Sequence, residues 1–240
     1  MLNFRATLAN LVNRNEHLFL IKQEADILRH KLFVADGAHY SWSQYGEDEL
    51  FVNELAAHLS DGFYVDVGAN HPTKISNTYR LYCLGMRGIT IEPNPVLHQL
   101  HMKYRPGDIH LCLGVSKQDG LLPFYRFTNH VLSTFSADEC RVRLSQGMHL
   151  LSQNPIPVLT IRTILSGCSF PERSVFSLLT IDTEALDEIV LSSNDWSRYK
   201  PKIICVEQCG HGDAIARYLE PHGYAKIAER GVNEIYKAKC

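Results

Sequence analysis

Small and acidic residues follow the apolar runs of this sequence. By their types and spacing, these residues could bind a nucleoside. The β-branched run at 62–67 breaks into Gly-Ala-Asn-His-Pro at 68–72, a turn that lets the backbone approach a ligand. A second run, at 88–91, ends in Glu92. That carboxylate can accept hydrogen bonds from both hydroxyls of a ribose, while the glycine turn leaves room for the rest of a cofactor.

Acidic residues also come directly after two later apolar runs. Asp182 and Glu184 follow the first of these runs, and Glu207 follows the second. Because ligands of parallel sheets bind beyond the carboxyl ends of the strands, we expect these side chains at the same edge as Glu92. The alternative is that such residues only cap the following helices, a role that would fully explain Asp182 or Asn94.

The glycine turn also distinguishes between cofactors. A dinucleotide site needs G-x-G-x-x-G, so that the pyrophosphate can rest on a helix N-terminus. Here only Gly68 is present, and His71 and Pro72 occupy the region of the later glycines. S-adenosylmethionine carries a nucleoside without a phosphate, and it still needs a ribose acid such as Glu92. A nicotinamide-dependent oxidoreductase is therefore the less favoured alternative.

The elements that position these residues alternate between strands and helices. Pro-Asn-Pro at 93–95 opens a helix at 96–104, on which His98 and His101 share a face that we expect to be solvated. The predicted fold class is α/β: a Rossmann-like sheet of seven mostly parallel strands with an antiparallel terminal hairpin, which fits a methyltransferase better than a dehydrogenase. The predicted strands lie at 62–67, 88–91, 108–116, 176–181, 201–206, 225–228 and 231–237.

The predicted domains are an N-terminal helical extension with a lid, residues 1–60, and a cofactor-binding domain, residues 61–240. The second domain carries an insertion at about 117–175, which is too long for a plain connection. Within it, residues 121–127 and 157–161 are predicted strands. We expect the insertion to face the substrate, because variable loops carry specificity.

Residues 1–34 predict a helix, since apolar positions recur near helical spacing with charged residues between them. Such a helix packs on its own domain or on a second copy, which would make a homodimer. Peripheral contact with a membrane is the alternative, although the polar face is mixed rather than basic.

The segment Ser-Gln-Tyr-Gly-Glu-Asp at 43–48 has two interpretations. Ser43 followed by two acids is typical of a helix start, with a hydroxyl cap and negative charges in the first turn. The same string, placed just before the nucleoside unit, also suits a lid over the cofactor.

Composition narrows the classes of partner and the compartment. The formal net charge is −2 without a basic block, which argues against a nucleic-acid surface. Seven cysteines, without a C-x-x-C pair, indicate free thiols in a reducing compartment. No stretch approaches the roughly 18 apolar residues of a transmembrane helix and no signal-peptide pattern is present, so we expect a soluble cytoplasmic protein.

Six motifs together resemble one family. They are Ser-Gln-Tyr-Gly-Glu-Asp at 43–48, Val-Asp-Val-Gly-Ala-Asn at 65–70, Ser-Asn-Thr at 76–78, Arg-Gly-Ile-Thr-Ile-Glu-Pro-Asn-Pro at 87–95, Gly-Val-Ser at 114–116 and Ile-Asp-Thr-Glu-Ala at 181–185. In this order and spacing they are similar to the FkbM family of S-adenosylmethionine-dependent methyltransferases. The resemblance implies O-methylation of a hydroxyl, typically on a sugar or a polyketide-type natural product.

The resemblance also implies which residues hold the cofactor. Asp66, Gly68 and Asn70 would line the methionine end, and Glu92 would hold the ribose. Further cofactor-binding positions carried over from the motifs are Gln44, Asn77, Asn94 on the adenine side and Ser116 near the adenine edge.

Methyl transfer to a hydroxyl needs in-line attack on the methyl group and a positioned base that takes the hydroxyl proton. The candidate bases are His71, Asp182, Glu184 and His211, and a histidine is favoured because it titrates near neutrality. Alternatively, Asp182, Glu184 and Glu207 could bind a divalent cation such as Mg²⁺, which would acidify the hydroxyl.

Two departures from the family pattern keep a second function open. The family commonly has Asp-Gly where this chain has His71 and Pro72, and a glycine in place of Ala185. These departures fit a catalytically inactive, methyltransferase-like binding module in a glycan-assembly complex. The intact Glu92 and Asn70 argue against that alternative.

Overall fold

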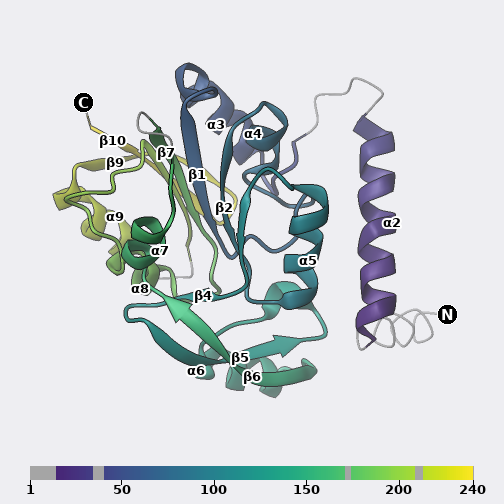
Figure 1. The fold of residues 1–240 in the computed structure, drawn as a ribbon. Helices are drawn as coiled ribbons and strands as arrows, with labels where there is room; N and C mark the ends of the chain where they lie inside the picture. Colours follow the sequence, from purple (N-terminus) through teal and green to yellow (C-terminus); the bar gives the residue numbers. More distant parts are fainter. Residues whose placement is uncertain (1–14, 35–40, 171–173, 209–212, 240) are drawn as a thin grey trace. The chain divides into compact units, whose positions relative to one another are not determined.

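A computed structural model describes residues 15–34, 41–170, 174–208 and 213–239 (Figure 1). The chain falls into two compact units, one made of Met1–Tyr40 and Pro123–Asn154 and the other of Ser41–Leu122 and Pro155–Cys240. The second unit is the larger and carries the predicted strands that lead to the cofactor residues. The predicted domain division between residues 60 and 61 stays a prediction.

The larger unit is built on a seven-stranded sheet with the order β3-β2-β1-β7-β8-β10-β9. Five strands are parallel to their neighbours, and β10 is antiparallel to both β8 and β9. The bounds are Gly62–Val67 (β1), Arg87–Ile91 (β2), Ile109–Leu111 (β3), Val175–Ile181 (β7), Ile203–Glu207 (β8), Tyr224–Arg230 (β9) and Asn233–Ala238 (β10). The predicted mostly parallel sheet with an antiparallel terminal hairpin is confirmed. Its strand order reverses between β1 and β7, the kind of position at which open sheets bind ligands.

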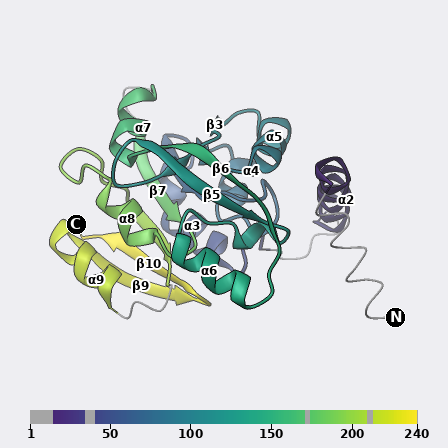
Figure 2. The same ribbon diagram turned by 90° about the horizontal axis from the view of Figure 1, so that it is seen from below.

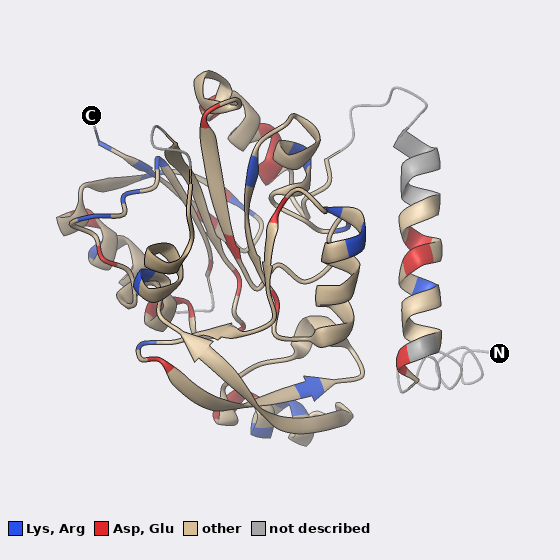
Figure 3. Cartoon of the chain, viewed as in Figure 1, with Lys and Arg blue, Asp and Glu red and all other residues tan. Residues whose placement is uncertain are grey.

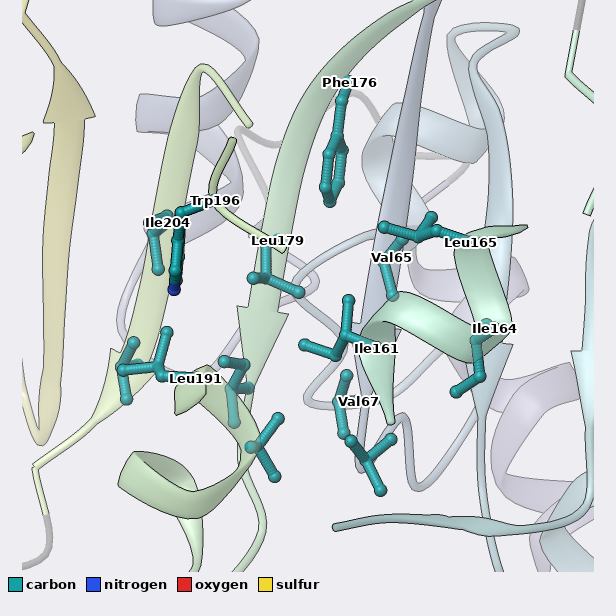
Figure 4. Packing of buried hydrophobic residues seen from close by; sticks show 14 of the residues in the cluster. Val65, Val67, Ile161, Ile164, Leu165, Phe176, Leu179, Leu191, Trp196 and Ile204 are labelled. Carbon is teal, nitrogen blue, oxygen red and sulfur yellow. The ribbon is translucent and has the colours of Figure 1, made fainter. Parts of the chain in front are cut away.

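Side chains of β1 alternate between two hydrophobic cores, one on each face of the sheet. On one face, Val65 and Val67 pack with Leu179 of β7 and with residues of the helices α7 and α8 (Figure 4). On the other face, Tyr64 packs with Phe51 of helix α3. Burial on both faces explains why this strand is a continuous apolar run in the sequence.

The helices of the larger unit are short, and α9 lies against strand β9 of the terminal hairpin (Figure 2). Their bounds are Glu47–Glu54 (α3), Tyr79–Cys83 (α4), Pro95–Tyr104 (α5), Ile161–Gly167 (α7), Asp187–Ser192 (α8) and Ala214–Leu219 (α9), with 3-10 turns at Ala56–His58 and Glu220–His222. Within the described part of the chain, no helix combines the length and the apolarity needed to cross a bilayer.

A separate three-stranded sheet has the order β4-β6-β5. Its strands are Gly114–Val115 (β4), Gly120–Phe127 (β5) and Leu150–Leu159 (β6), and β4 pairs in parallel with β6. The prediction of one third strand at 108–116 is therefore wrong. The apolar pattern is continuous, but the chain leaves the large sheet after Leu111 and joins another sheet at Gly114.

The predicted strand at 157–161 also ends early. Thr160 is the N-cap of α7, and its hydroxyl accepts a hydrogen bond from the Thr163 N–H at 3.0 Å. The β-branched residues Thr160 and Ile161 favoured a strand in the sequence, whereas the capping bond places them at a helix start.

The smaller unit contains helices α2, Glu16–Val34, and α6, Ala137–Ser145, and a 3-10 turn at His130–Leu132. The predicted N-terminal helix is present as α2, and residues 1–14 lie outside the described part of the chain. The buried Phe19 ring meets the His130 ring edge-on at 5.3 Å. Leu18, Ile21 and Leu28 are exposed on the same helix. Dimerisation or membrane contact through α2 stays a prediction.

A buried ion pair fastens the strands that lead to the predicted site. Arg105, directly after α5, is fully buried, and its Nε donates to Asp108 Oδ2 at 2.9 Å. The guanidinium also donates to Tyr64 Oη at 2.7 Å and to Thr78 Oγ1 at 3.0 Å. Thr78 in turn donates its hydroxyl hydrogen to Asp66. The network therefore joins β1, the segment before α4 and the end of α5.

The burial of Asp66 predicts an unusual pH dependence of the stability of the fold. Burial raises the pKa of Asp66 to about 6, against the opposing effects of Arg105 and the Thr78 hydrogen bond. A carboxyl group whose pKa is higher in the folded than in the unfolded chain stabilises the fold at low pH and loses that contribution as the pH rises. We expect the wild type to lose about 2–3 kcal/mol of stability relative to Asp66→Asn between about pH 4 and pH 7.

Urea denaturation across this pH range measures the difference. Asp213→Asn, which removes an exposed carboxylate, is the control for the general loss of one acidic group. A pH-independent difference between the wild type and Asp66→Asn would contradict the prediction.

Candidate functional site

The turn after β1 is held against the end of β7 because Gly68 has no side chain. Gly68 has φ 78°, and a Cβ at this position would overlap the carbonyl oxygen of Asp182. Asn70 has φ 47°, a left-handed conformation that asparagine adopts more readily than most residues. The turn at Gly68 therefore brings the end of β1 into contact with the end of β7, where the strand order of the sheet reverses.

Glu92 ties this turn to the loop after β2. It is buried, its Oε2 accepts the Asn70 N–H at 2.8 Å, and its Oε1 accepts the Asn94 N–H at 2.7 Å. A carboxylate has about four acceptor positions. These two bonds use different oxygens of the carboxylate and fix its orientation between the turn after β1 and the loop after β2.

Of the two roles expected for Asn94, capping a helix and contacting adenine, the structure shows the first. It is the N-cap of α5: its Oδ1 accepts the Val96 N–H at 3.2 Å, and Pro95 occupies the first helical position. An adenine contact of Asn94 stays a prediction. Asp66 is likewise engaged within the buried Arg105 network, which explains its presence without a cofactor.

The described contacts of His71 give it a structural role. The ring is buried, and its Nδ1 accepts the N–H groups of Thr73 at 3.2 Å and Lys74 at 3.0 Å. In the neutral ring, an accepting Nδ1 places the hydrogen on Nε2, so His71 holds the loop and is poorly suited to take a substrate proton. The other histidine candidate, His211, lies outside the described residues.

Three carboxylates meet beyond the ends of β7 and β8. Asp182, Glu184 and Glu207 each offer an oxygen, and these oxygens lie within 4.8 Å of one another. The backbone is left-handed at Glu184, with φ 55°, and at Ala185, with φ 81°. A glycine would adopt the second conformation without strain, which gives the family's glycine at this position a physical reason.

The electrostatics of this acid cluster favour a bound proton. Desolvation and the negative charges of Glu207 and Glu184 raise the pKa of Asp182 well above its usual range. Because Asp182 is exposed to solvent, the rise comes chiefly from the neighbouring negative charges. Lys and Arg are interspersed with Asp and Glu over the described chain (Figure 3), so this close grouping of acids is a local feature.

The segment at 41–48 forms an ordered loop before α3. The predicted N-cap is wrong: Gly46, with φ 82°, occupies the cap position, and the Ser43 hydroxyl accepts the Asp48 N–H from outside the helix at 3.2 Å. Glu47 Oε1 accepts a hydrogen bond from Asn233 Nδ2 of β10 at 2.6 Å. Gln44 is exposed and donates to the Tyr45 hydroxyl at 3.0 Å. A lid function of this loop stays a prediction.

The two remaining predicted cofactor residues make contacts within the protein. Asn77 Nδ2 donates to Thr180 Oγ1 of β7 at 3.1 Å. The Ser116 N–H donates to the Leu159 carbonyl oxygen at 3.1 Å. Neither contact tests their expected roles toward a cofactor.

The expectation of a solvated face on α5 is wrong for His101, which is fully buried. Its Nε2 lies 2.9 Å from the carbonyl oxygen of Asn70. Since a carbonyl oxygen only accepts, Nε2 carries the hydrogen of this bond. One sequence signal points to this burial: His101 lies four positions after Leu97, a residue on the buried face of the same helix.

The family model that matches this sequence is described as the methyltransferase FkbM domain, and it covers residues 66–226. The chain belongs to the FkbM methyltransferase family. The family is one of S-adenosylmethionine-dependent methyltransferases, and the seven-stranded sheet is a Rossmann-like, class I methyltransferase fold. The match begins at the buried acid of β1 and ends within β9.

Among solved structures, the chain is similar to a TehB-like SAM-dependent methyltransferase from Corynebacterium glutamicum ATCC 13032 Kitasato. The two are 13% identical, with 91% of this chain and 99% of that chain covered and a TM-score of 0.40. The comparison with curated proteins found no match. The assignment to the FkbM family therefore rests on the family model.

The Gly68 turn generates a stability and binding prediction. We expect Gly68→Ala to destabilise the protein by more than the roughly 1–2 kcal/mol of a left-handed alanine, because the new Cβ also overlaps the Asp182 carbonyl oxygen. The same variant should bind S-adenosylhomocysteine, the demethylated cofactor, at least tenfold more weakly.

Gly223→Ala is the matched control, since Gly223 has φ 88° and, chain neighbours aside, no atom of the described residues lies within 4 Å of the added Cβ. Urea denaturation and calorimetric titration measure the two effects. Equal destabilisation by the two substitutions, with unchanged cofactor binding, would show that the contact with Asp182 is unimportant.

Proposed function

We propose that this FkbM family member is an S-adenosylmethionine-dependent O-methyltransferase that acts on a hydroxyl of a sugar, a polysaccharide precursor or a related natural product. The observation that carries the proposal is Glu92, a buried acid oriented by the N–H groups of Asn70 and Asn94 where the sheet reverses its strand order. Family membership supports the methyl transfer, and the resemblance of the motifs supports the class of acceptor.

The residues at the turn fit this cofactor. The orientation of Glu92 by the Asn70 and Asn94 N–H groups supports the proposal that Glu92 accepts from ribose hydroxyls. The Asn70 Oδ1 is buried and has no hydrogen-bond partner among the described residues. Because an unsatisfied buried acceptor costs about 1–3 kcal/mol, a donor such as the ammonium group of the methionine moiety would stabilise it. When bound, S-adenosylmethionine supplies a methyl group on a positively charged sulfur.

The chain must also take a proton from the acceptor hydroxyl. Among the described candidates, His71 is engaged through Nδ1, whereas Asp182 and Glu184 lie in the open acid cluster with Glu207. Burial and the neighbouring negative charges raise the pKa of Asp182, which moves this carboxyl group toward the range that suits a base at neutral pH. We propose a carboxylate of this cluster, without a metal ion, as the base.

A divalent cation bound by the same three carboxylates is the alternative. Mg²⁺ prefers oxygen ligands, and three converging carboxylate oxygens could hold it. In that case the cation would lower the pKa of the acceptor hydroxyl, and the cluster would act as ligands.

Calorimetric titration of the full chain with S-adenosylhomocysteine and with NAD tests the cofactor. We expect binding of the first only, and Glu92→Gln should weaken it about 10- to 100-fold, because an amide accepts at one oxygen only. Binding of NAD would support the oxidoreductase alternative. Binding of neither would support the inactive binding module. Screening nucleotide sugars and lipid-linked glycans for methyl transfer then tests the acceptor class.

The base and the cation make opposite predictions for chelation. With the base proposed here, turnover should survive exhaustive EDTA treatment, and Asp182→Asn should lower kcat by about 10²–10⁴-fold while the affinity for S-adenosylhomocysteine stays unchanged. The exposed Glu188→Gln on α8 is the control and should keep full turnover. Loss of turnover on chelation, restored by Mg²⁺, would overturn the metal-free mechanism.

A further inference from the structure

His101 is a buried histidine on α5 whose position the hydrophobic core does not explain. Its side chain is fully buried, and its Nδ1 has no hydrogen-bond partner among the described residues. An unsatisfied buried acceptor costs about 1–3 kcal/mol, so an apolar residue of similar size would suit packing better. The described hydrogen bond of this ring is the one that Nε2 donates to the Asn70 carbonyl oxygen, at 2.9 Å.

The acceptor of this hydrogen bond is Asn70, whose conformation shapes the turn after β1. Asn70 is left-handed, with φ 47°, a conformation that costs a non-glycine residue free energy. Its N–H points to Glu92 at 2.8 Å, and its carbonyl oxygen points to His101. Both backbone groups of Asn70 are thus held, one by the ribose acid of β2 and the other by α5.

The surroundings of His101 keep its ring neutral and in one tautomer. Desolvation and the positive charge of Arg105 lower its pKa well below the usual range, so the ring is unprotonated at neutral pH. The centroids of the His101 and His110 rings lie 5.7 Å apart. His110 Nε2 lies 2.8 Å from the Arg105 carbonyl oxygen, so Nε2 of His110 carries a hydrogen. A neutral His101 with its hydrogen on Nε2 is the form that can donate to Asn70.

We propose that His101 is a positioning residue for the cofactor: it holds Asn70 in its left-handed conformation, so that the Asn70 side chain and Glu92 face the methionine and ribose parts of S-adenosylmethionine. The proposal rests on the cofactor site proposed above. It assigns His101 no contact with the cofactor or the reacting atoms. Its effect is on cofactor affinity, and the chemical step is left to the acid cluster at β7 and β8.

The test compares two amides of different reach. In His101→Gln the side-chain NH₂ lies near the position of Nε2 and can donate to Asn70, whereas in His101→Asn the chain is one carbon shorter and cannot. We expect His101→Gln to keep the affinity for S-adenosylhomocysteine within about threefold of the wild type and His101→Asn to lose tenfold or more. At saturating cofactor, kcat should be similar in both, so that the loss appears in KM for S-adenosylmethionine.

His98→Leu, one turn earlier on α5, is the control and should bind the cofactor as the wild type does. Amide hydrogen exchange of residues 69–74 in the cofactor-free protein gives a second readout, and exchange should be faster in His101→Asn than in His101→Gln. Equal affinities and equal exchange for the two amides, or a loss confined to kcat, would overturn the proposal. If the wild type itself does not bind S-adenosylhomocysteine, the proposed function fails, whereas the exchange comparison still tests the contact between His101 and Asn70.

Discussion

The buried pair of Arg105 and Asp108 is the interaction on which the cofactor side of this sheet depends. The guanidinium has no access to solvent and donates to Asp108, to the Tyr64 hydroxyl and to Thr78. Asp108 also accepts the N–H of Gly88 in β2 at 2.9 Å. Two charges in a protein interior are tolerable only when such bonds satisfy them, and removal of one partner typically costs about 3–5 kcal/mol. One ion pair therefore fixes β1, β2 and the segment before α4 relative to one another.

The site is built at the open ends of the strands that this pair aligns. Gly68 lets the turn after β1 touch the backbone of Asp182, and Glu92 holds the N–H groups of Asn70 and Asn94. The contact of Gly68 with Asp182 and the hydrogen bond of Asn70 with Glu92 both use the backbone of the turn as one partner. In the cofactor site that we propose, recognition therefore depends on backbone position, because a small displacement of the turn would move Gly68 and Asn70 together.

The acid cluster differs from Glu92 in the groups that surround its carboxylates. Glu92 accepts hydrogen bonds from two backbone donors, whereas Asp182 lies close to Glu184 and Glu207, whose negative charges contribute to its raised pKa. Such an arrangement destabilises the ionised state of the folded protein, and active sites are a common place for it. The contrast agrees with the two roles that we propose for these strand ends: Glu92 after β2 binds the cofactor, and the acids after β7 and β8 take the proton.

Local patterns in the sequence determined the fold and the cofactor turn. Apolar runs mark the strands, and Pro95 and Asn94 mark the start of α5, because each of these features needs only neighbours within a few residues. Gly68 and Glu92, at the ends of two successive apolar runs, predict the nucleoside site that we propose. Only the tertiary structure decided which of the polar residues form hydrogen bonds with distant parts of the chain. Asp66 meets Thr78, and His101 meets Asn70 across 31 positions of the chain. Contacts of this range depend on how helices pack on the sheet, and helical spacing by itself does not specify which polar side chain finds a buried partner.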